Sequence, residues 1–287
     1  MRVLISGYSG LVGTELSKQL RELGHEPVAL VRRTATQDNE VSWNPGVEEL
    51  DDKLMESIDA VVNLGGATTG RIPWTKKYMQ TIISSRLDST KALVDAINRA
   101  KNQPRVLISG SASGIYGNRG DEILNEDSGR GNGFLADLAS QWEAEAAKAD
   151  TRVVYARTTM VMSKKLGALG RLLPLIKAGI GGPLGSGQQW WAWISLEDEA
   201  RAIIHLINDE QASGPYNLTA PEPATCEQIV KSLGKALRRP TFLRVPAWAM
   251  RLLVGVAAEE LLLCSQKMSA NKLLDSGFKF KHPTLEK

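Results

Sequence analysis

Three glycines near the start of the chain have the spacing of a loop that binds a dinucleotide. Gly7, Gly10 and Gly13 form a GxxGxxG motif between a β-rich run at 2–6 and a helical apolar pattern at 10–23. One glycine permits a tight turn, the next lets the backbone approach a pyrophosphate, and the third allows close helix packing. The free N–H groups of the helix N-terminus then face the phosphates. The predicted dinucleotide contacts in this loop are Gly7, Ser9, Gly10, Leu11, Val12 and Gly13.

Two arginines follow the second strand-like run, 27–31, where the ribose of the adenosine half would lie. An acidic residue at this place binds the 2′-hydroxyl of NAD, whereas Arg32 and Arg33 can grip a 2′-phosphate. The alternative is a solvated pair of charges at the end of a strand. We predict NADP(H) as the cofactor.

Further cofactor contacts are predicted where the next strands end. Leu64, Gly65 and Gly66 follow the strand-like run 60–64, and their small size lets the chain pass close beneath the adenosine half, although they can equally serve only to turn the chain. Arg86, in a predicted helix at 77–100, either points back to the cofactor or is a surface charge. Ser109 and Met160 complete the predicted set.

Three hydroxyl groups are the candidates for catalysis. Ser111, Ser113 and Tyr116 follow the strand-like run 106–109, at the sheet edge where a nicotinamide would lie, and each can transfer a proton. Tyr116 can instead pack beneath its loop as a structural aromatic residue. Glu143, in a predicted helix at 134–149, is read mainly as a residue that holds this helix to the core.

A Gly- and Trp-rich stretch follows at 179–193 and supplies candidate substrate contacts. Gln188, Trp190 and Trp193 can line a pocket, because aromatic faces stack on sugars and other rings. The alternative is packing between two parts of the molecule. Glu197 and Asp198 precede a helical pattern, and we expect them to cap it, since negative charge is favourable at a helix N-terminus.

Apolar strands alternate with helical patterns through the first half of the chain, which indicates a parallel sheet covered on both faces. The predicted fold class is α/β, with a Rossmann-type doubly wound sheet and a smaller, mostly helical C-terminal lobe. We expect residues 1–163 to form the NADP(H)-binding domain, with 192–220 returning to it. Residues 164–191 and 221–287 are expected to form the substrate lobe.

Composition excludes several other functions. The net charge of +3 over 287 residues, with no run of five basic residues, predicts neither a nucleic-acid nor a membrane partner. Two distant cysteines and three scattered histidines predict no metal site. We expect a cytoplasmic protein with a small-molecule substrate; a monomer and a homodimer remain equally open.

The sequence resembles the short-chain dehydrogenase/reductase superfamily, and within it an atypical family of epimerase-like proteins. The resemblance rests on GxxGxxG, on NLGGA at 63–67 and on SGSASGIYG at 109–117, in that order. More specific matches are SRLDSTKALVDAI at 85–97, FLADLASQWEAEA at 134–146 and GIGGPLGSGQQWWAWISLEDEARAI at 179–203. YNLTAPEPAT at 216–225 and RPTFLRVPAWAMRLLVG at 239–255 extend the likeness over essentially the whole chain. It implies NADP(H) at the glycine loop, with Arg33 and Arg86 among its contacts, and a substrate cleft formed by the C-terminal lobe.

One departure from the superfamily pattern limits this expectation. Extended relatives carry a Tyr-xxx-Lys pair on the helix after the serine loop, whereas this chain reads FLADLAS at 134–140, with neither residue at that spacing. Two hypotheses follow. The first is an NADP(H)-dependent oxidoreductase or nucleotide-sugar epimerase-like enzyme in which Ser111, Ser113 or Tyr116 handles the proton. The second is a non-catalytic NADP(H)-binding redox sensor or scaffold.

Overall fold

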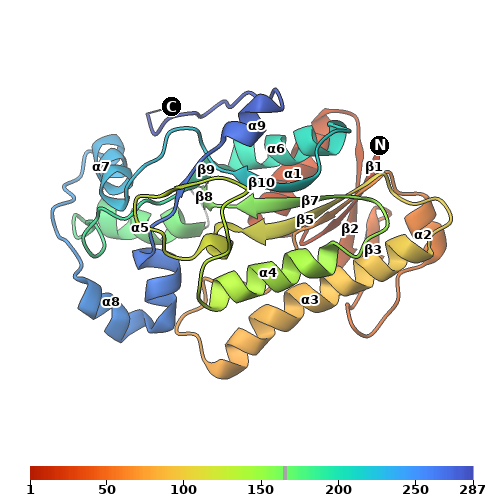
Figure 1. Cartoon of the computed structure of the whole chain (residues 1–287), viewed down its shortest axis with the longest axis horizontal. Helices are drawn as coiled ribbons and strands as arrows, with labels where there is room; N and C mark the ends of the chain where they lie inside the picture. The colour runs from red at the N-terminus through yellow and green to blue at the C-terminus, as the bar shows by residue number, and fades with distance from the viewer. Residues whose placement is uncertain (164–166, 287) are drawn as a thin grey trace.

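The computed structural model describes residues 1–163 and 167–286, and the predicted domain boundary at 164 falls on residues outside this range. At its centre is a seven-stranded sheet in which all strand pairs are parallel (Figure 1). The strands in spatial order are β10 (Gly214–Leu218), β7 (Arg152–Thr158), β5 (Val106–Ala112), β4 (Ala60–Asn63), β1 (Arg2–Ser6), β2 (Glu26–Val31) and β3 (Glu40–Ser42). The predicted doubly wound α/β fold is confirmed.

Helices cover both faces of this sheet because the strands are apolar on both sides. In β1, Val3 and Ile5 pack in the cluster that holds α1 (Leu11–Glu22) and α6 (Leu196–Asn208). Leu4 points to the opposite cluster, which contains residues of α3 (Lys76–Arg99), while α4 (Phe134–Ala146) packs beside α3. The short helix α2 (Asp52–Glu56) adds Met55 to this second cluster.

The order of the strands reverses direction at β1. From β1 the chain builds outward to β2 and β3, and it then returns to place β4 on the other side of β1. In open α/β sheets, a ligand binds outside the carboxyl ends of the strands at such a switch point. The glycine loop follows β1, and the Leu64–Gly66 segment follows β4, so both lie at this point.

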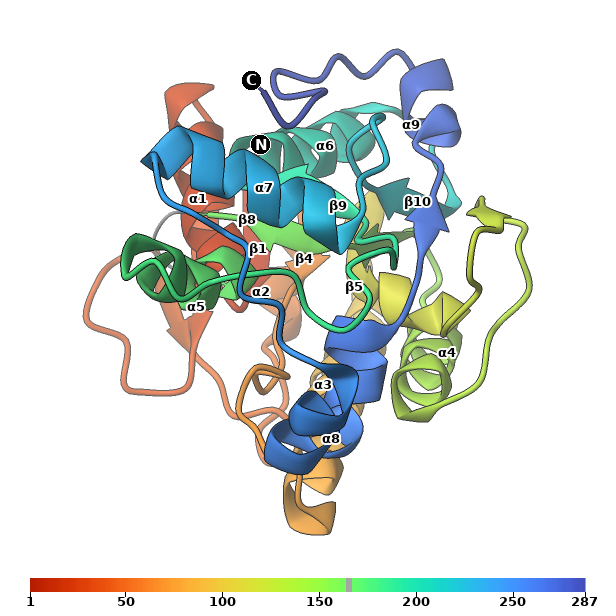
Figure 2. The same ribbon diagram turned by 90° about the vertical axis from the view of Figure 1, so that its left-hand side faces the viewer.

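All but one of the remaining elements gather at the end of the molecule toward which the strands' carboxyl ends point (Figure 1). Figure 2 turns this end toward the viewer and shows α5, α7 and α8 in front of the sheet. These elements are η1 (Ser113–Tyr116), β6 (Ile123–Leu124), β8 (Met160–Met162), α5 (Gly167–Lys177), β9 (Trp193–Ser195), α7 (Cys226–Leu237), α8 (Ala247–Val254), the π-helix η2 (Ala258–Leu263) and β11 (Lys267–Met268). The exception, α9 (Asn271–Asp275), packs against β10, where Lys272 donates to the Pro215 carbonyl at 2.8 Å. No helix in the described part of the chain is long and apolar enough to span a bilayer.

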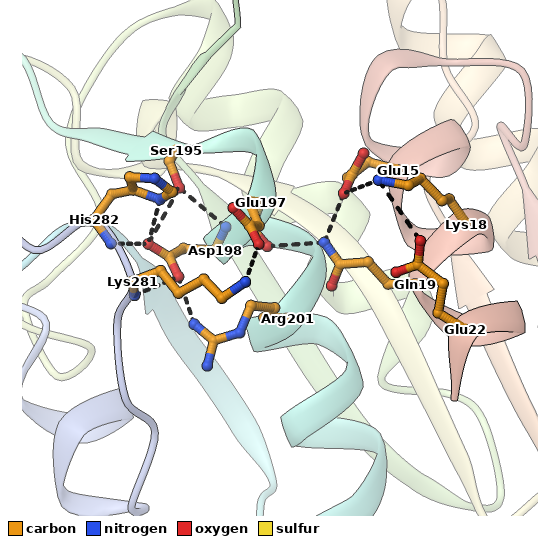
Figure 3. A network of polar contacts seen from close by, with 10 residues as sticks. All are labelled: Glu15, Lys18, Gln19, Glu22, Ser195, Glu197, Asp198, Arg201, Lys281 and His282. Carbon is orange, nitrogen blue, oxygen red and sulfur yellow. Dashed lines mark hydrogen bonds and ion pairs between the residues drawn. The ribbon is translucent and has the colours of Figure 1, made fainter. Parts of the chain in front are cut away.

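The C-terminal tail is bound to the start of α6 by a buried carboxylate (Figure 3). Asp198 is fully buried and accepts hydrogen bonds from the backbone amides of Lys281 and His282, at 2.9 and 2.8 Å, and from Arg201 at 2.7 Å. The expectation that Glu197 and Asp198 cap α6 is corrected in one respect, because both lie in the first turn of the helix. The N-cap residue is Ser195, whose hydroxyl accepts from the Asp198 amide at 3.0 Å.

Candidate functional site

The glycine loop after β1 is built so tightly that two of its positions exclude a side chain. Gly7 has φ = +73°, and a Cβ there would lie 2.6 Å from the carbonyl oxygen of Leu64. A Cβ on Gly13 would lie 2.3 Å from the Gly7 carbonyl oxygen. Both obstacles are backbone atoms, which cannot swing away. The loop therefore brings the start of α1 against β1 and β4, as the motif predicts.

The loop leaves the N-terminus of α1 open. The first hydrogen bond of the helix runs from the Thr14 amide to the Gly10 carbonyl, and the amides of Leu11, Val12 and Gly13 have no acceptor among the described residues. No side chain in the described part of the chain caps this end, and the first turn carries no acidic residue. Backbone amides and the helix dipole make such an end suited to an anion.

A buried polar network fixes the two segments at the switch point. The Ser6 hydroxyl donates to Asn63 Oδ1 at 2.5 Å and accepts from the Gly65 amide at 3.0 Å. Asn63 and Trp142 both donate to the Thr90 hydroxyl at 2.8 Å. This network ties β1, β4, α3 and α4 together directly behind the glycine loop.

Arg86 extends from α3 toward the segment after β4. A Cβ on Gly66 would lie 2.9 Å from the guanidinium carbon, so the glycine makes room for this side chain. The guanidinium donates to the carbonyls of Ala67 and Ile82, both at 3.1 Å, and lies 5.2 Å from the ring of Trp142. Burial lowers its pKa to about 10. Within the described residues it has no carboxylate partner, so its charge is not neutralised by another side chain there.

The two predicted 2′-phosphate residues differ in their surroundings. Arg33 forms a two-point ion pair with Glu40, in which Nη1 and Nη2 lie 2.8 and 2.5 Å from the carboxylate oxygens. These bonds lower the pKa of Glu40 to about 2. Arg32 is exposed and has no ion pair or hydrogen bond to another described residue. Of the two arginines after β2, Arg32 is therefore the one without a charged partner among the residues that the structure describes.

The predicted catalytic residue Ser111 belongs to a chain of polar contacts at the end of β5. Its hydroxyl donates to Glu143 at 2.6 Å. Glu143 forms a two-point ion pair with Arg157, at 2.9 and 3.0 Å, and both side chains are largely buried. The reading of Glu143 as a residue that holds α4 to the core agrees with this geometry. Ser111 is a partner of that ion pair and only 4% exposed.

Tyr116 and Ser113 lie in η1, directly after β5, and their surroundings differ. Tyr116 is fully buried; its hydroxyl donates to Asn217 Oδ1 at 2.7 Å and accepts from Arg157 at 2.8 Å. Burial raises the pKa of this phenol to about 12. Ser113 is half-buried, and its hydroxyl has no hydrogen bond to the residues that the structure describes. The catalytic assignments stay predictions, and this geometry favours Ser113 among the three.

The surroundings of the other predicted cofactor contacts, Ser9, Ser109 and Met160, do not test their predicted role. Ser9 is exposed on the glycine loop, while Ser109 is fully buried and its hydroxyl is 3.2 Å from the Gly110 carbonyl. Met160 opens β8, and its amide donates to Ala192 at 3.1 Å. All of them remain predictions.

The three predicted substrate residues contact different parts of the structure. Gln188 donates to Glu227 of α7 at 2.9 Å, and the indole N–H of Trp190 donates to Asp121 at 2.7 Å. Trp193 is buried and donates to the carbonyl of Glu222 at 3.1 Å. The alternative of packing between elements describes Trp193 well. The assignment of these residues to a substrate pocket stays a prediction.

Sequence reasoning missed three acidic residues that shape the site. Glu40 pairs with Arg33, and Glu260 accepts from the amides at the start of α4 at 2.9 and 3.1 Å. Glu199 of α6 is fully buried; one of its oxygens accepts from Thr158 at 2.7 Å, and the other has no partner in the described residues. The burial of Glu199 could have been suspected, because it lies in the apolar pattern of α6.

Comparison with known proteins gives the family. The family model described as NAD dependent epimerase/dehydratase family matches residues 3–219, and a domain of unknown function, DUF1731, matches residues 245–287. An epimerase family protein of Mycobacterium leprae, ML0860, is 39% identical over 99% of this chain and 92% of its own length. The Staphylococcus aureus epimerase family protein SA0724 is 36% identical over 99% of this chain and 96% of its own.

Solved structures agree with the sequence relatives. The human epimerase family protein SDR39U1, crystallised with NADPH, superimposes with a TM-score of 0.91 at 30% identity, over 100% of this chain and 97% of that chain. A complex of MoeE5 with UDP-glucuronic acid and NAD has a TM-score of 0.80, over 100% of this chain and 96% of that chain, but its 19% identity shows only the shared fold. The resemblance predicted from the motifs is confirmed, and the chain belongs to the NAD-dependent epimerase/dehydratase family, with a DUF1731 segment at its C-terminus.

Proposed function

We propose that this protein binds NADP(H) at the carboxyl ends of β1, β2 and β4. The observation that carries the proposal is the open N-terminus of α1 beside a glycine loop whose Gly7 and Gly13 exclude side chains. Three amides there have no acceptor among the described residues and suit a pyrophosphate. Arg32 and Arg86, neither of which has a carboxylate partner in the described part of the chain, supply cations for the 2′-phosphate and for a second anionic group. The NADPH held by the human relative supports the same cofactor.

We further propose that the protein is an oxidoreductase or epimerase-like enzyme acting on a small polar molecule. The nicotinamide ring, when bound, donates or accepts a hydride. The protein's part is to orient the substrate oxygen and to handle its proton. Ser113 suits this role, because its hydroxyl lies at the end of β5 and is not engaged by Glu143, unlike that of Ser111.

The second candidate function is a non-catalytic NADP(H)-binding sensor or scaffold. It is favoured by α4, where Leu135 and Leu138 are buried in a helix that lacks the Tyr-xxx-Lys pair. The burial of Tyr116 between Arg157 and Asn217 also leaves that phenol without the usual features of a proton donor.

A location in the cytoplasm is proposed with this function. Cys226 and Cys264 are free thiols in buried positions, and burial raises their pKa values to about 11 and about 12. Thiols kept protonated in the core suit a reducing compartment, where disulfides do not form.

Binding and turnover are tested separately. The fluorescence of the seven tryptophans should change on titration with NADPH, at lower concentration than with NADH; a failure of both nucleotides to bind would refute the cofactor site. NADPH oxidation is then followed across a panel of carbonyl compounds and nucleotide sugars, with Ser113→Ala beside the wild type. Turnover that Ser113→Ala abolishes supports the enzyme. Tight binding with no turnover supports the sensor.

A further inference from the structure

The surface around α8 is apolar and open to solvent. Met250 and Val254 pack inward, whereas Trp248 and Leu252, one turn apart on the outer side of the helix, are 67% and 79% exposed. The α8 patch is defined as the exposed apolar residues of this stretch, namely Phe242, Leu243, Trp248, Leu252, Leu253 and Val256. Single exposed apolar residues are ordinary on a soluble protein, but six within fifteen consecutive positions mark an interaction surface.

Two segments, one that runs up to the start of α3 and one that includes α8, are rich in basic residues. The segments 71–77 and 238–256 contain seven Lys or Arg residues and no Asp or Glu. The rest of the chain therefore carries a net charge of −4, because the whole chain carries +3. The seven are Arg71, Lys76, Lys77, Arg238, Arg239, Arg244 and Arg251.

The two basic segments belong to one end of the molecule. Trp74, just before α3, packs in the same hydrophobic cluster as Met250 and Val254 of α8. Figure 2 shows the beginning of α3 and α8 together at that end. Two of the basic residues have acidic neighbours, since Arg244 lies 3.5 Å from Glu227 and Arg251 is paired with Glu259. The other five have no ion pair within the described residues.

The charge around the patch decides between possible occupants. A second copy that met this surface through a twofold axis would bring the same basic residues face to face, and like charges oppose such a contact. A bilayer with anionic headgroups offers the complementary charge and an apolar interior for Trp and Leu side chains. We propose that the α8 patch docks the protein on the surface of an anionic lipid bilayer.

This inference does not depend on the proposed cofactor or reaction. It also differs from the expectation that net charge gave for the whole chain, which predicted no membrane partner. The net charge of +3 does not show that basic residues are unevenly distributed along the chain. An anionic lipid surface interacts with the local positive charge beside exposed apolar side chains, and not with the net charge of the whole protein. Docking requires no membrane-spanning helix, because the patch lies in the interface plane.

The test is co-sedimentation of the full chain with vesicles of phosphatidylcholine alone and with 30% phosphatidylserine, at about 0.1 M and about 0.5 M salt. The wild type should bind the anionic vesicles, and the higher salt should weaken this binding. Trp248→Ser combined with Leu252→Ser should lower the partition at least about tenfold. Arg238→Gln combined with Arg239→Gln should reduce the preference for phosphatidylserine while leaving the fold unchanged.

Matched control variants distinguish docking through the α8 patch from nonspecific hydrophobic adsorption to vesicles. Leu23→Ser and Ile123→Ser remove exposed apolar side chains, 59% and 65% accessible, that lie outside the patch, and they should bind vesicles like the wild type. Equal losses in these controls and in the Trp248/Leu252 variant would overturn the proposal. It is also overturned if the wild type binds neither vesicle. Dimers in lipid-free buffer that the Trp248/Leu252 variant abolishes would then make a second copy of the chain the occupant of the patch.

Discussion

Arg33 and Glu40 face each other in a two-point ion pair, seven residues apart in sequence, beside the exposed Arg32. The pair places a carboxylate at the end of β2, where the 2′-phosphate of NADPH is expected to lie. The positive charge of Arg33 is therefore largely balanced by Glu40, and Arg32 is the residue that we expect to distinguish NADPH from NADH.

Removal of the Glu40 charge should strengthen NADPH binding. Glu40→Gln removes a negative charge near the proposed phosphate and releases the Arg33 guanidinium, so NADPH affinity should rise about threefold. NADH affinity, measured in the same titration, should not change. Weaker NADPH binding by Glu40→Gln would instead show that Glu40 holds Arg33 in its binding position.

Removal of Arg32 should have the opposite effect. Arg32→Ala takes away the free cation, and NADPH affinity should fall by about tenfold or more, the range of a lost charge-assisted hydrogen bond. Arg33→Ala is the matched control, with a smaller loss because that guanidinium is already engaged by Glu40. Calorimetric titration with NADPH and NADH measures both variants; an equal loss for the two nucleotides would rule out 2′-phosphate recognition by Arg32.

The fold was predictable because its signals are local. Continuous apolar runs such as 2–6 bury both faces of a strand, and the helix expected over 77–100 is α3, which begins and ends one residue earlier. Gly7 and Gly13 were recognisable for the same reason, since spacing alone reports the turn that they permit. The three-residue strand β3 was missed, because it is too short for a periodic pattern.

The partners of the charged side chains were not predictable. Glu260 caps α4 although it lies 126 residues from Phe134, and Arg157 meets Glu143 across the strand–helix boundary. Such contacts depend on which faces of two distant elements pack against each other in the fold. The hydrophobic periodicity of a single sequence does not contain this information. The buried partners of the Ser111 and Tyr116 hydroxyls were not predictable for the same reason, and the catalytic roles of both residues stay predictions.

Arg86 should affect cofactor binding and stability in opposite directions. Arg86→Met keeps the length of the side chain and its packing on Trp142 but removes a half-buried cation that has no carboxylate partner. The free protein should therefore melt at the same temperature or higher, because no unpaired charge remains to be desolvated. Affinity for NADPH and NADH should fall together, by about tenfold, if the anion that Arg86 awaits is a phosphate common to both. Thermal melts and titrations check the two effects; a lower melting temperature with unchanged binding would assign Arg86 to structure alone.

Glu199 should make the stability of the protein depend on pH. Burial raises its pKa from 4.5 to about 8, so the folded protein holds a proton that the unfolded chain releases. The stability that this group contributes is fully present below about pH 4.5 and is lost as the pH rises toward 8. Glu199→Gln retains an acceptor for Thr158 and cannot ionise. At pH 8 this variant should melt about 4 °C or more above the wild type, with a smaller difference at pH 5. Parallel melts at the two pH values measure it; a wild type that is as stable at pH 8 as its variant would place the pKa near its usual value.

Tyr116 offers a direct test of structure against catalysis. Its hydroxyl joins Arg157 to Asn217 in a buried position, so Tyr116→Phe leaves an N–H and an amide oxygen unpaired. The expected cost is about 1–3 kcal/mol of unfolding free energy, seen as a lower melting temperature or denaturation midpoint. If Tyr116 has only a structural role, the variant loses this stability and nothing else. Its kcat in any NADPH-dependent reaction should then stay within about twofold of the wild type, measured at a temperature where the variant is folded, because a proton donor contributes far more than twofold.

Ser113→Ala is the matched control; it removes a hydroxyl without a partner among the described residues and should lower kcat with little change in stability. The reverse pattern, in which Tyr116→Phe abolishes turnover but not stability, would make the phenol the proton donor and require the η1 segment to open during the reaction.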